Sequence, residues 1–89
     1  MENAIQNIIK TKIPKGCIFD AHTIIEHLIQ NDSDIYLSTY QNNWTTKYYH
    51  SEISKKITSL EEILIKRQGD SWSQNIHNKF TQNVCWMKL

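Results

Sequence analysis

Cationic, hydroxyl, amide and imidazole side chains recur between residues 47 and 79, and their chemistry is that of contacts to phosphate and to base edges. A lysine neutralises a phosphate, whereas hydroxyl, amide and imidazole groups hydrogen-bond phosphate oxygens or groove atoms of bases. The candidate residues for such contacts are Lys47, Tyr48, His50, Ser51, Ser54, Lys55, Lys66, Arg67, Asn75, His77 and Lys79.

Metal binding and hydrolysis have less support. His22 and His27 are too far apart in sequence to share one face of a helix, so we expect His22 to be hydrogen-bonded near a helix start. Gly69-Asp70-Ser71 lacks the second glycine of a nucleophile elbow, since Ser73 stands there. Neither paired carboxylates nor a phosphate-binding glycine loop is evident. We expect no enzyme activity, no metal and no cofactor.

Three helices with clear apolar stripes must position the candidate residues. Isoleucines three and four residues apart predict a helix over 3–12, which ends before Pro14. A second helix is predicted over about 21–30, with Asp20 as its N-cap and Phe19 and Ile24 as a hydrophobic staple. A third begins after a cap at Thr45 or Thr46 and buries Tyr49, Ile53, Ile57 and Leu60.

Between the second and third helices, residues 33–40 favour a short helix over a strand. Ser33 or Asp34 would cap it, and the polar run 41–43 would form a turn. After Leu60 the period changes to alternation, which predicts antiparallel strands over 62–67 and 83–88, joined by a long polar connection over 71–82. Residues 59–62 could instead cap a fourth helix.

The three tryptophans have different expected environments. Trp86 lies in an alternating apolar strand and is predicted to be core, and Trp44 is predicted to pack between two helices. Trp72 lies in a polar stretch, where it either folds back on the core or anchors a partner.

The order of these elements resembles the winged-helix DNA-binding family. The resemblance rests on residues 33–41, the turn, the helix 46–58 and the strand pair 62–67 with 83–88, and family members often carry Gly where this chain has Asn78. The chain is also similar to small uncharacterised bacterial proteins through the spaced residues Phe19, His22, Ile25, Ser73, Ile76, Asn83 and Trp86. The resemblance implies an α+β winged helix, with three to four helices followed by an antiparallel β-hairpin wing, and binding to double-stranded DNA.

Charge is distributed unevenly along the chain. The formal net charge of +1 combines a net −2 over residues 1–43 with a net +3 over residues 44–89. The basic excess therefore coincides with the third helix and the hairpin, where Gln74 accompanies the candidates already named. A cationic face favours nucleic acid because each neutralised phosphate releases counterions. The third helix has no Arg, so we expect contacts to the backbone or to A·T pairs rather than strong reading of guanine.

Length and composition limit the architecture. A chain of 89 residues with 39% hydrophobic and 21% charged residues predicts one folded domain over 1–89. Within it we expect an N-terminal helix over 1–14, a helical core with the helix-turn-helix over 19–60, and the hairpin over 61–89. Cys17 and Cys85 are predicted to be buried thiols, and a disulfide between them is the alternative.

The absence of a long apolar run or a signal-like N-terminus predicts a cytoplasmic protein without membrane contact. The excess of Lys over Arg suggests an AT-rich bacterial or phage genome. The leading expectation is a small DNA-binding regulator or DNA-contacting accessory protein. The alternative is a protein-interaction module or an inhibitor of a host or phage machine that does not bind DNA. The sequence does not decide between a monomer and a homodimer.

Overall fold

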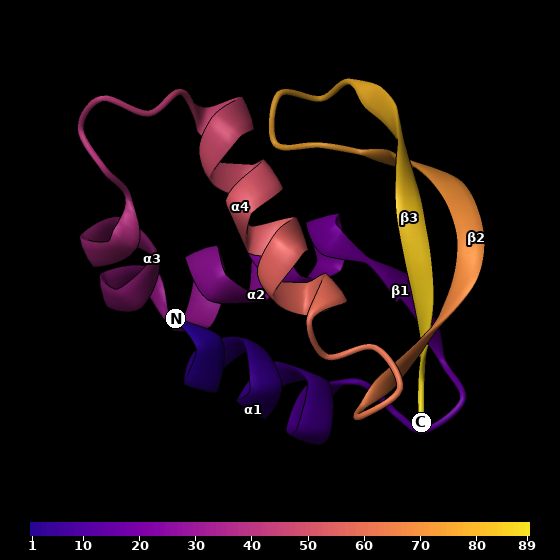
Figure 1. The fold of residues 1–89 in the computed structure, drawn as a ribbon. Helices are drawn as coiled ribbons and strands as arrows, with labels where there is room; N and C mark the ends of the chain where they lie inside the picture. Colours follow the sequence, from indigo (N-terminus) through magenta and orange to yellow (C-terminus); the bar gives the residue numbers. More distant parts are fainter.

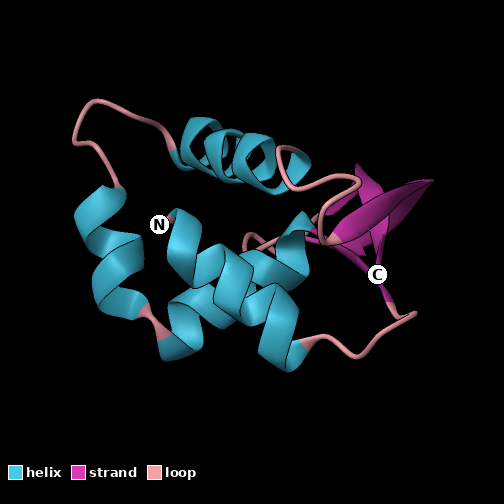
Figure 2. Ribbon diagram, turned by 60° about the horizontal axis from the view of Figure 1, so that its bottom comes forward, coloured by secondary structure: helices cyan, strands magenta, loops and turns pink.

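The computed structural model describes residues 1–89. It is an α+β fold with four helices and a small antiparallel sheet (Figure 1). The sheet lies to one side of the helices (Figure 2). In chain order the elements are α1 (Glu2–Lys12), β1 (Ile18–Asp20), α2 (Ala21–Asn31), α3 (Ser33–Thr39), α4 (Thr46–Thr58), β2 (Ile65–Gln74) and β3 (Phe80–Lys88).

The helices of the predicted core form with the expected caps at α2 and α4. The carboxylate of Asp20 accepts a hydrogen bond from the Thr23 backbone N–H at 3.3 Å. The hydroxyl of Thr45 accepts one from the Tyr48 backbone N–H at 3.1 Å. Each cap satisfies a donor that the first helical turn leaves free, which explains why the helices begin there.

Helix α3 is present, but the prediction of its cap was wrong. Its N-cap position is Asp32, without a side-chain hydrogen bond, and Ser33 is already helical. Residue Asp32 also ends α2, since its N–H bonds to the Leu28 carbonyl, so the two helices share one junction. The alternative of a further helix after residue 58 was also wrong, because residues 59–64 form turns.

The prediction of the hairpin was right in type and wrong in extent. Strands β2 and β3 pair from Ile65 with Lys88 to Gln74 with Phe80, which leaves residues 75–79 as the loop instead of 71–82. The sequence missed this because the distal half of the hairpin, next to the loop, is mostly polar and has no buried residue, which removes the apolar alternation that identifies a half-buried strand. Strand β1 was also missed. It has three residues and pairs with β3 through contacts such as Phe19 with Trp86, giving the order β1-β3-β2.

Asn75 organises the hairpin loop. Its side-chain oxygen accepts hydrogen bonds from the backbone N–H groups of His77 at 2.9 Å and Lys79 at 3.1 Å. Asn78 adopts a positive φ of 63°, a left-handed conformation that asparagine tolerates better than most residues. The loop therefore turns tightly without a glycine at this position.

The core lies between the helices and the sheet. Its most buried side chains come from α1, α2, α4, β2 and β3, and they are Ile5, Ile9, Ile24, Ile25, Leu28, Tyr49, Ile53, Ile57, Ile65 and Trp86. The prediction of a core Trp86 is confirmed. Trp44 packs on the rings of Tyr48 and Tyr49, with centroids 5.2 and 5.9 Å away.

One of the two alternatives for Trp72 is excluded, and the prediction of burial was wrong for one of the two cysteines. Trp72 does not fold back on the core, because it lies on the distal part of the hairpin and keeps 67% of its surface exposed. Cys17 is exposed in the turn before β1, whereas Cys85 is buried, and both are free thiols. The turn places Cys17 beside the last residues of β3, where its carbonyl accepts from the Lys88 N–H.

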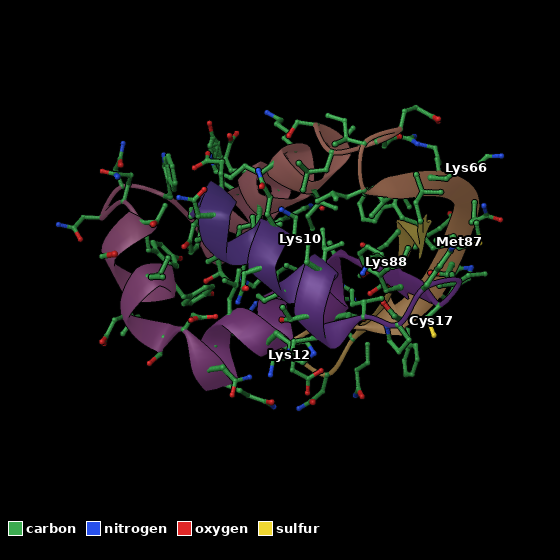
Figure 3. The ribbon with its side chains drawn as sticks, turned by 90° about the horizontal axis from the view of Figure 1, so that it is seen from below. Lys10, Lys12, Cys17, Lys66, Met87 and Lys88 are labelled. Carbon is green, nitrogen blue, oxygen red and sulfur yellow. The ribbon has the colours of Figure 1, made fainter.

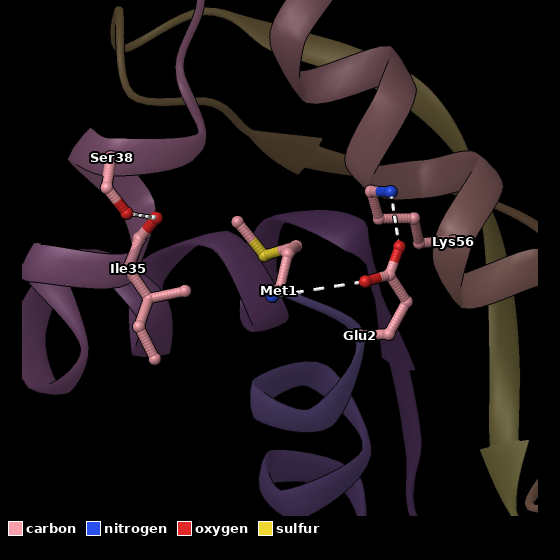
Figure 4. Close-up of polar contacts among 5 residues, drawn as sticks. All are labelled: Met1, Glu2, Ile35, Ser38 and Lys56. Carbon is pink, nitrogen blue, oxygen red and sulfur yellow. Dashed lines mark hydrogen bonds and ion pairs between the residues drawn. The ribbon is translucent and has the colours of Figure 1, made fainter.

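Polar contacts at both of its ends attach α1 to the rest of the fold. At its start, Glu2 pairs with Lys56 of α4, with 2.5 Å between Oε1 and Nζ (Figure 4). At its end, the ammonium of Lys88 donates to the carbonyl oxygens of Ile9 at 2.7 Å and Ile13 at 3.1 Å. A cation at the C-terminal end of a helix satisfies free carbonyls and complements the helix dipole.

Candidate nucleic-acid interface

An open groove lies between α4, the first turns of α2 and the distal hairpin, and we call it the α4–hairpin groove. Its volume is about 550 Å³. Lining residues come from α2, α4, the hairpin loop and β3, and they are Ala21, His22, Ile25, Thr46, Lys47, His50, Ser51, Ser54, Asn75, His77, Lys79, Thr81, Gln82 and Asn83. No aspartate or glutamate is among them, so apart from the apolar Ala21 and Ile25 the groove is lined by cationic and neutral polar side chains.

The groove brings together seven of the eleven candidate residues. Four come from α4, and three come from the hairpin loop, which lies beside the first turns of α4 (Figure 1). The seven are Lys47, His50, Ser51, Ser54, Asn75, His77 and Lys79. Two segments more than 20 residues apart in sequence thus form one surface, as the sequence predicted in outline.

Two candidates on α4 lie outside the groove. Tyr48 is partly exposed and its ring packs against Trp44 instead. Lys55 forms an ion pair with Glu52 on the same helix, at 3.0 Å between Nζ and Oε1. Because this pair is exposed, it is screened by solvent and leaves Lys55 only weakly held.

The two candidates at the start of β2 also lie away from the groove. The guanidinium of Arg67 pairs with both carboxylate oxygens of Glu61, at 2.9 and 3.2 Å. Lys66, near the start of β2, does not line the groove, and the view from below shows it near the edge of the molecule, apart from Lys10 and Lys12 of α1 (Figure 3). The sequence assigned both residues to the wing because it did not foresee how far the hairpin extends beyond them.

Charge in the groove comes from Lys47 and Lys79. The ion pairs of the protein engage Lys55, Lys56 and Arg67 as well as the N-terminal amine, but neither of these two lysines. Lys47 is in the first turn of α4 and Lys79 ends the hairpin loop. Their ammonium groups are therefore free to neutralise an anion that enters between the two elements.

His50 is the most perturbed titratable group in the groove. Burial, together with the neighbouring His22 and His77, lowers the pKa of His50 to about 4. Its Nε2 lies 2.7 Å from the hydroxyl of Tyr36 on α3. The imidazole is thus neutral near pH 7 and contributes hydrogen bonding rather than charge to the groove.

Sequence reasoning did not assign seven lining residues to the site, namely the apolar Ala21 and Ile25 and the polar His22, Thr46, Thr81, Gln82 and Asn83. The prediction that His22 is hydrogen-bonded near a helix start is confirmed, since its Nδ1 lies 2.5 Å from the hydroxyl of Ser73. The partner could not be foreseen, because the contact spans 51 positions and depends on the hairpin folding over the start of α2.

Comparison of the chain with protein-family models, curated proteins and solved structures gave no match. No helix in the structure has the length and apolar character needed to span a bilayer. No cluster of three or more His, Cys, Asp or Glu side chains has an arrangement that could hold a metal ion.

Proposed function

We propose that this protein is a small winged-helix protein that binds double-stranded DNA, as a transcriptional regulator or a DNA-contacting accessory protein. In this proposal α4 is the recognition helix and the β2–β3 hairpin is the wing. The observation that carries it is the α4–hairpin groove, which contains two unpaired lysines and three histidines and no carboxylate. A recognition helix and a wing that embrace a DNA strand would place its phosphates in such a groove.

The neutral polar groups of the groove suit backbone contacts. Ser54 and Asn75 offer hydroxyl and amide donors, whereas the Ser51 hydroxyl already donates to the Tyr48 carbonyl. Such donors supply many of the contacts that proteins make to phosphate and sugar. Arginine, the usual reader of guanine, is absent from α4. We therefore expect binding that depends weakly on sequence and strongly on salt.

The proposal is tested by titrating the full chain into a fluorescent random-sequence duplex and measuring anisotropy at several salt concentrations. Binding at about 50 mM salt that weakens steeply as salt rises supports the proposal. Absence of binding at that salt concentration would exclude it. Sedimentation of the free protein in the same buffer establishes whether one copy or two carry the contacts.

A second candidate function is recognition of another protein, and one surface favours it. Trp72 and Phe80 are 67% and 66% exposed, and the strand register places them diagonally on one face of the hairpin. Exposed aromatic side chains in this arrangement are typical of interaction hot spots. If the duplex does not bind, the Trp72–Phe80 face becomes the leading interface, and Trp72→Ala is the variant that tests it.

A further inference from the structure

The hydrogen bonds of Ser73 fix the protonation of one nitrogen of His22. The Ser73 hydroxyl donates to the carboxylate of Asp20, which also caps α2. A hydroxyl has one hydrogen, so the contact at 2.5 Å between its oxygen and His22 Nδ1 must have the imidazole as donor. His22 therefore carries its proton on Nδ1, and Nε2 is the nitrogen left for a ligand.

A similar argument applies to His50. Its Nε2 is 2.7 Å from the hydroxyl of Tyr36. A phenol donates more readily than a neutral imidazole N–H does, and an imidazole nitrogen accepts better than a phenol oxygen. Tyr36 is therefore the donor, which leaves the Nδ1–H of His50 without a partner in the protein.

Both remaining nitrogens are accessible from the groove. The buried polar atoms without a partner are His27 Nδ1 and Trp86 Nε1, and neither groove histidine contributes one. His22 and His50 line the groove together, with Lys47 and Lys79 on its α4 and hairpin sides. The groove thus combines two imidazoles whose protein partners are defined with two lysines that form no ion pair.

We propose that His22 and His50 form a binding site for one DNA backbone phosphate in the α4–hairpin groove, and that the phosphate binds together with a proton on His22. This inference rests on the proposed function. Phosphate oxygens only accept hydrogen bonds, so neutral His50 can donate from Nδ1 as it stands. His22 can donate from Nε2 only as the imidazolium, and Asp20 behind Ser73 offsets its charge.

The surroundings of His22 define how this proton is held. From α2 and β1 the charged groups near it are Glu26, which borders the neighbouring pocket, and Asp20. From α4 they are Lys47 and His50, and from the hairpin they are His77 and Lys79. The bound phosphate brings negative charge into the groove, and a nearby anion favours the charged form of an imidazole.

A proton that binds with the ligand makes affinity depend on pH. The dissociation constant for random duplex should fall by up to about tenfold per unit as the pH decreases from 8 to 6, because one proton is taken up. Tyr36 and Ser73 act as positioning residues, since each touches the phosphate only through its histidine. Tyr36→Phe keeps the ring in place and removes only the hydroxyl that orients His50.

The experiment measures duplex anisotropy for the full chain at pH 6, 7 and 8 at constant salt. His22→Gln should abolish the pH dependence, and Ser73→Ala should reduce it. His50→Gln and Tyr36→Phe should weaken binding by about tenfold and threefold at every pH and leave the pH dependence intact. His27→Gln is the matched control, because His27 is on α2 and does not line the groove. Thermal melts establish that each variant is folded.

Three outcomes overturn the inference without touching the proposed function. Binding of the wild type that is independent of pH excludes proton uptake. Loss of the pH dependence in His77→Gln instead of His22→Gln would show that the proton binds to His77 and not to His22. An effect of His22→Gln confined to particular base sequences would show contact with a base edge rather than a phosphate. Absence of duplex binding at every pH is a different result, because it excludes the proposed function itself.

Discussion

The hydroxyl of Tyr36 lies 2.7 Å from Nε2 of His50, and this contact joins α3 to α4 at the edge of the groove. Tyr36 is itself buried against Tyr49, whose hydroxyl donates to the Tyr36 carbonyl at 2.5 Å. The short helix α3 thus supports the surface that α4 presents, although it contributes no side chain to the groove.

The state of His50 predicts how stability changes with pH. Its folded pKa is about 4 because burial disfavours the charged ring, whereas the ordinary value is 6.5. Between these values the unfolded chain binds more protons at this site than the folded one. The contribution of neutral His50 to the free energy of unfolding is therefore complete above pH 6.5 and is lost as the pH falls towards 4. Urea denaturation at pH 7.5, 5.5 and 4.5 should show this loss in the wild type and a smaller one in His50→Gln. Equal losses in both proteins would contradict the prediction.

The unpaired lysines predict where salt dependence originates. Lys47→Ala and Lys79→Ala should each weaken duplex binding and reduce the slope of log affinity against log salt by roughly one unit. Lys66→Ala is the matched control, because Lys66 lies near the start of β2 and outside the groove, and its loss should leave the slope unchanged (Figure 3). A reduction of the salt slope in Lys66→Ala as large as in the groove variants would show that the DNA is not bound in the groove.

The sequence predicted most of the helical fold, and particular residues explain why. Asp20 and Thr45 are caps whose effect is local, and the apolar stripes they precede extend over three turns or more. The distal hairpin was not predicted, because Ser71 and Ser73 are stabilised by pairing with β3 and not by burial of an apolar face. In the groove, the α4 residues followed from the helical period. His22 did not, because its position depends on contacts across the whole chain.

The hydrogen bonds of Lys88 connect the last strand, β3, to the end of the first helix, α1. Lys88→Met keeps much of the side-chain volume and removes the ammonium that donates to the Ile9 and Ile13 carbonyls. The expected cost is about 1–2 kcal/mol of unfolding free energy, from lost charged hydrogen bonds and lost interaction with the helix dipole. Hydrogen exchange should accelerate most at the end of α1. Lys66→Met, in exposed β2, serves as control, and equal acceleration in both variants would contradict a specific role of Lys88.

The two thiols should differ in reactivity. Cys17 is exposed and Cys85 is buried in β3, so a thiol reagent should label one cysteine per chain at once and the second only on opening of the fold. Labelling of Cys17→Ser should be slow in buffer and fast in denaturant. Rapid reaction of two thiols per native chain would show that the sheet does not cover Cys85.

The central claim is that DNA occupies the α4–hairpin groove, and mapping of amide chemical shifts on titration with a random duplex tests it most directly. We predict that the largest changes fall on residues 46–54 and 75–83, together with His22 at the start of α2. Changes concentrated instead on the Trp72–Phe80 face, or around Lys10, Lys12 or Lys66, would contradict the account.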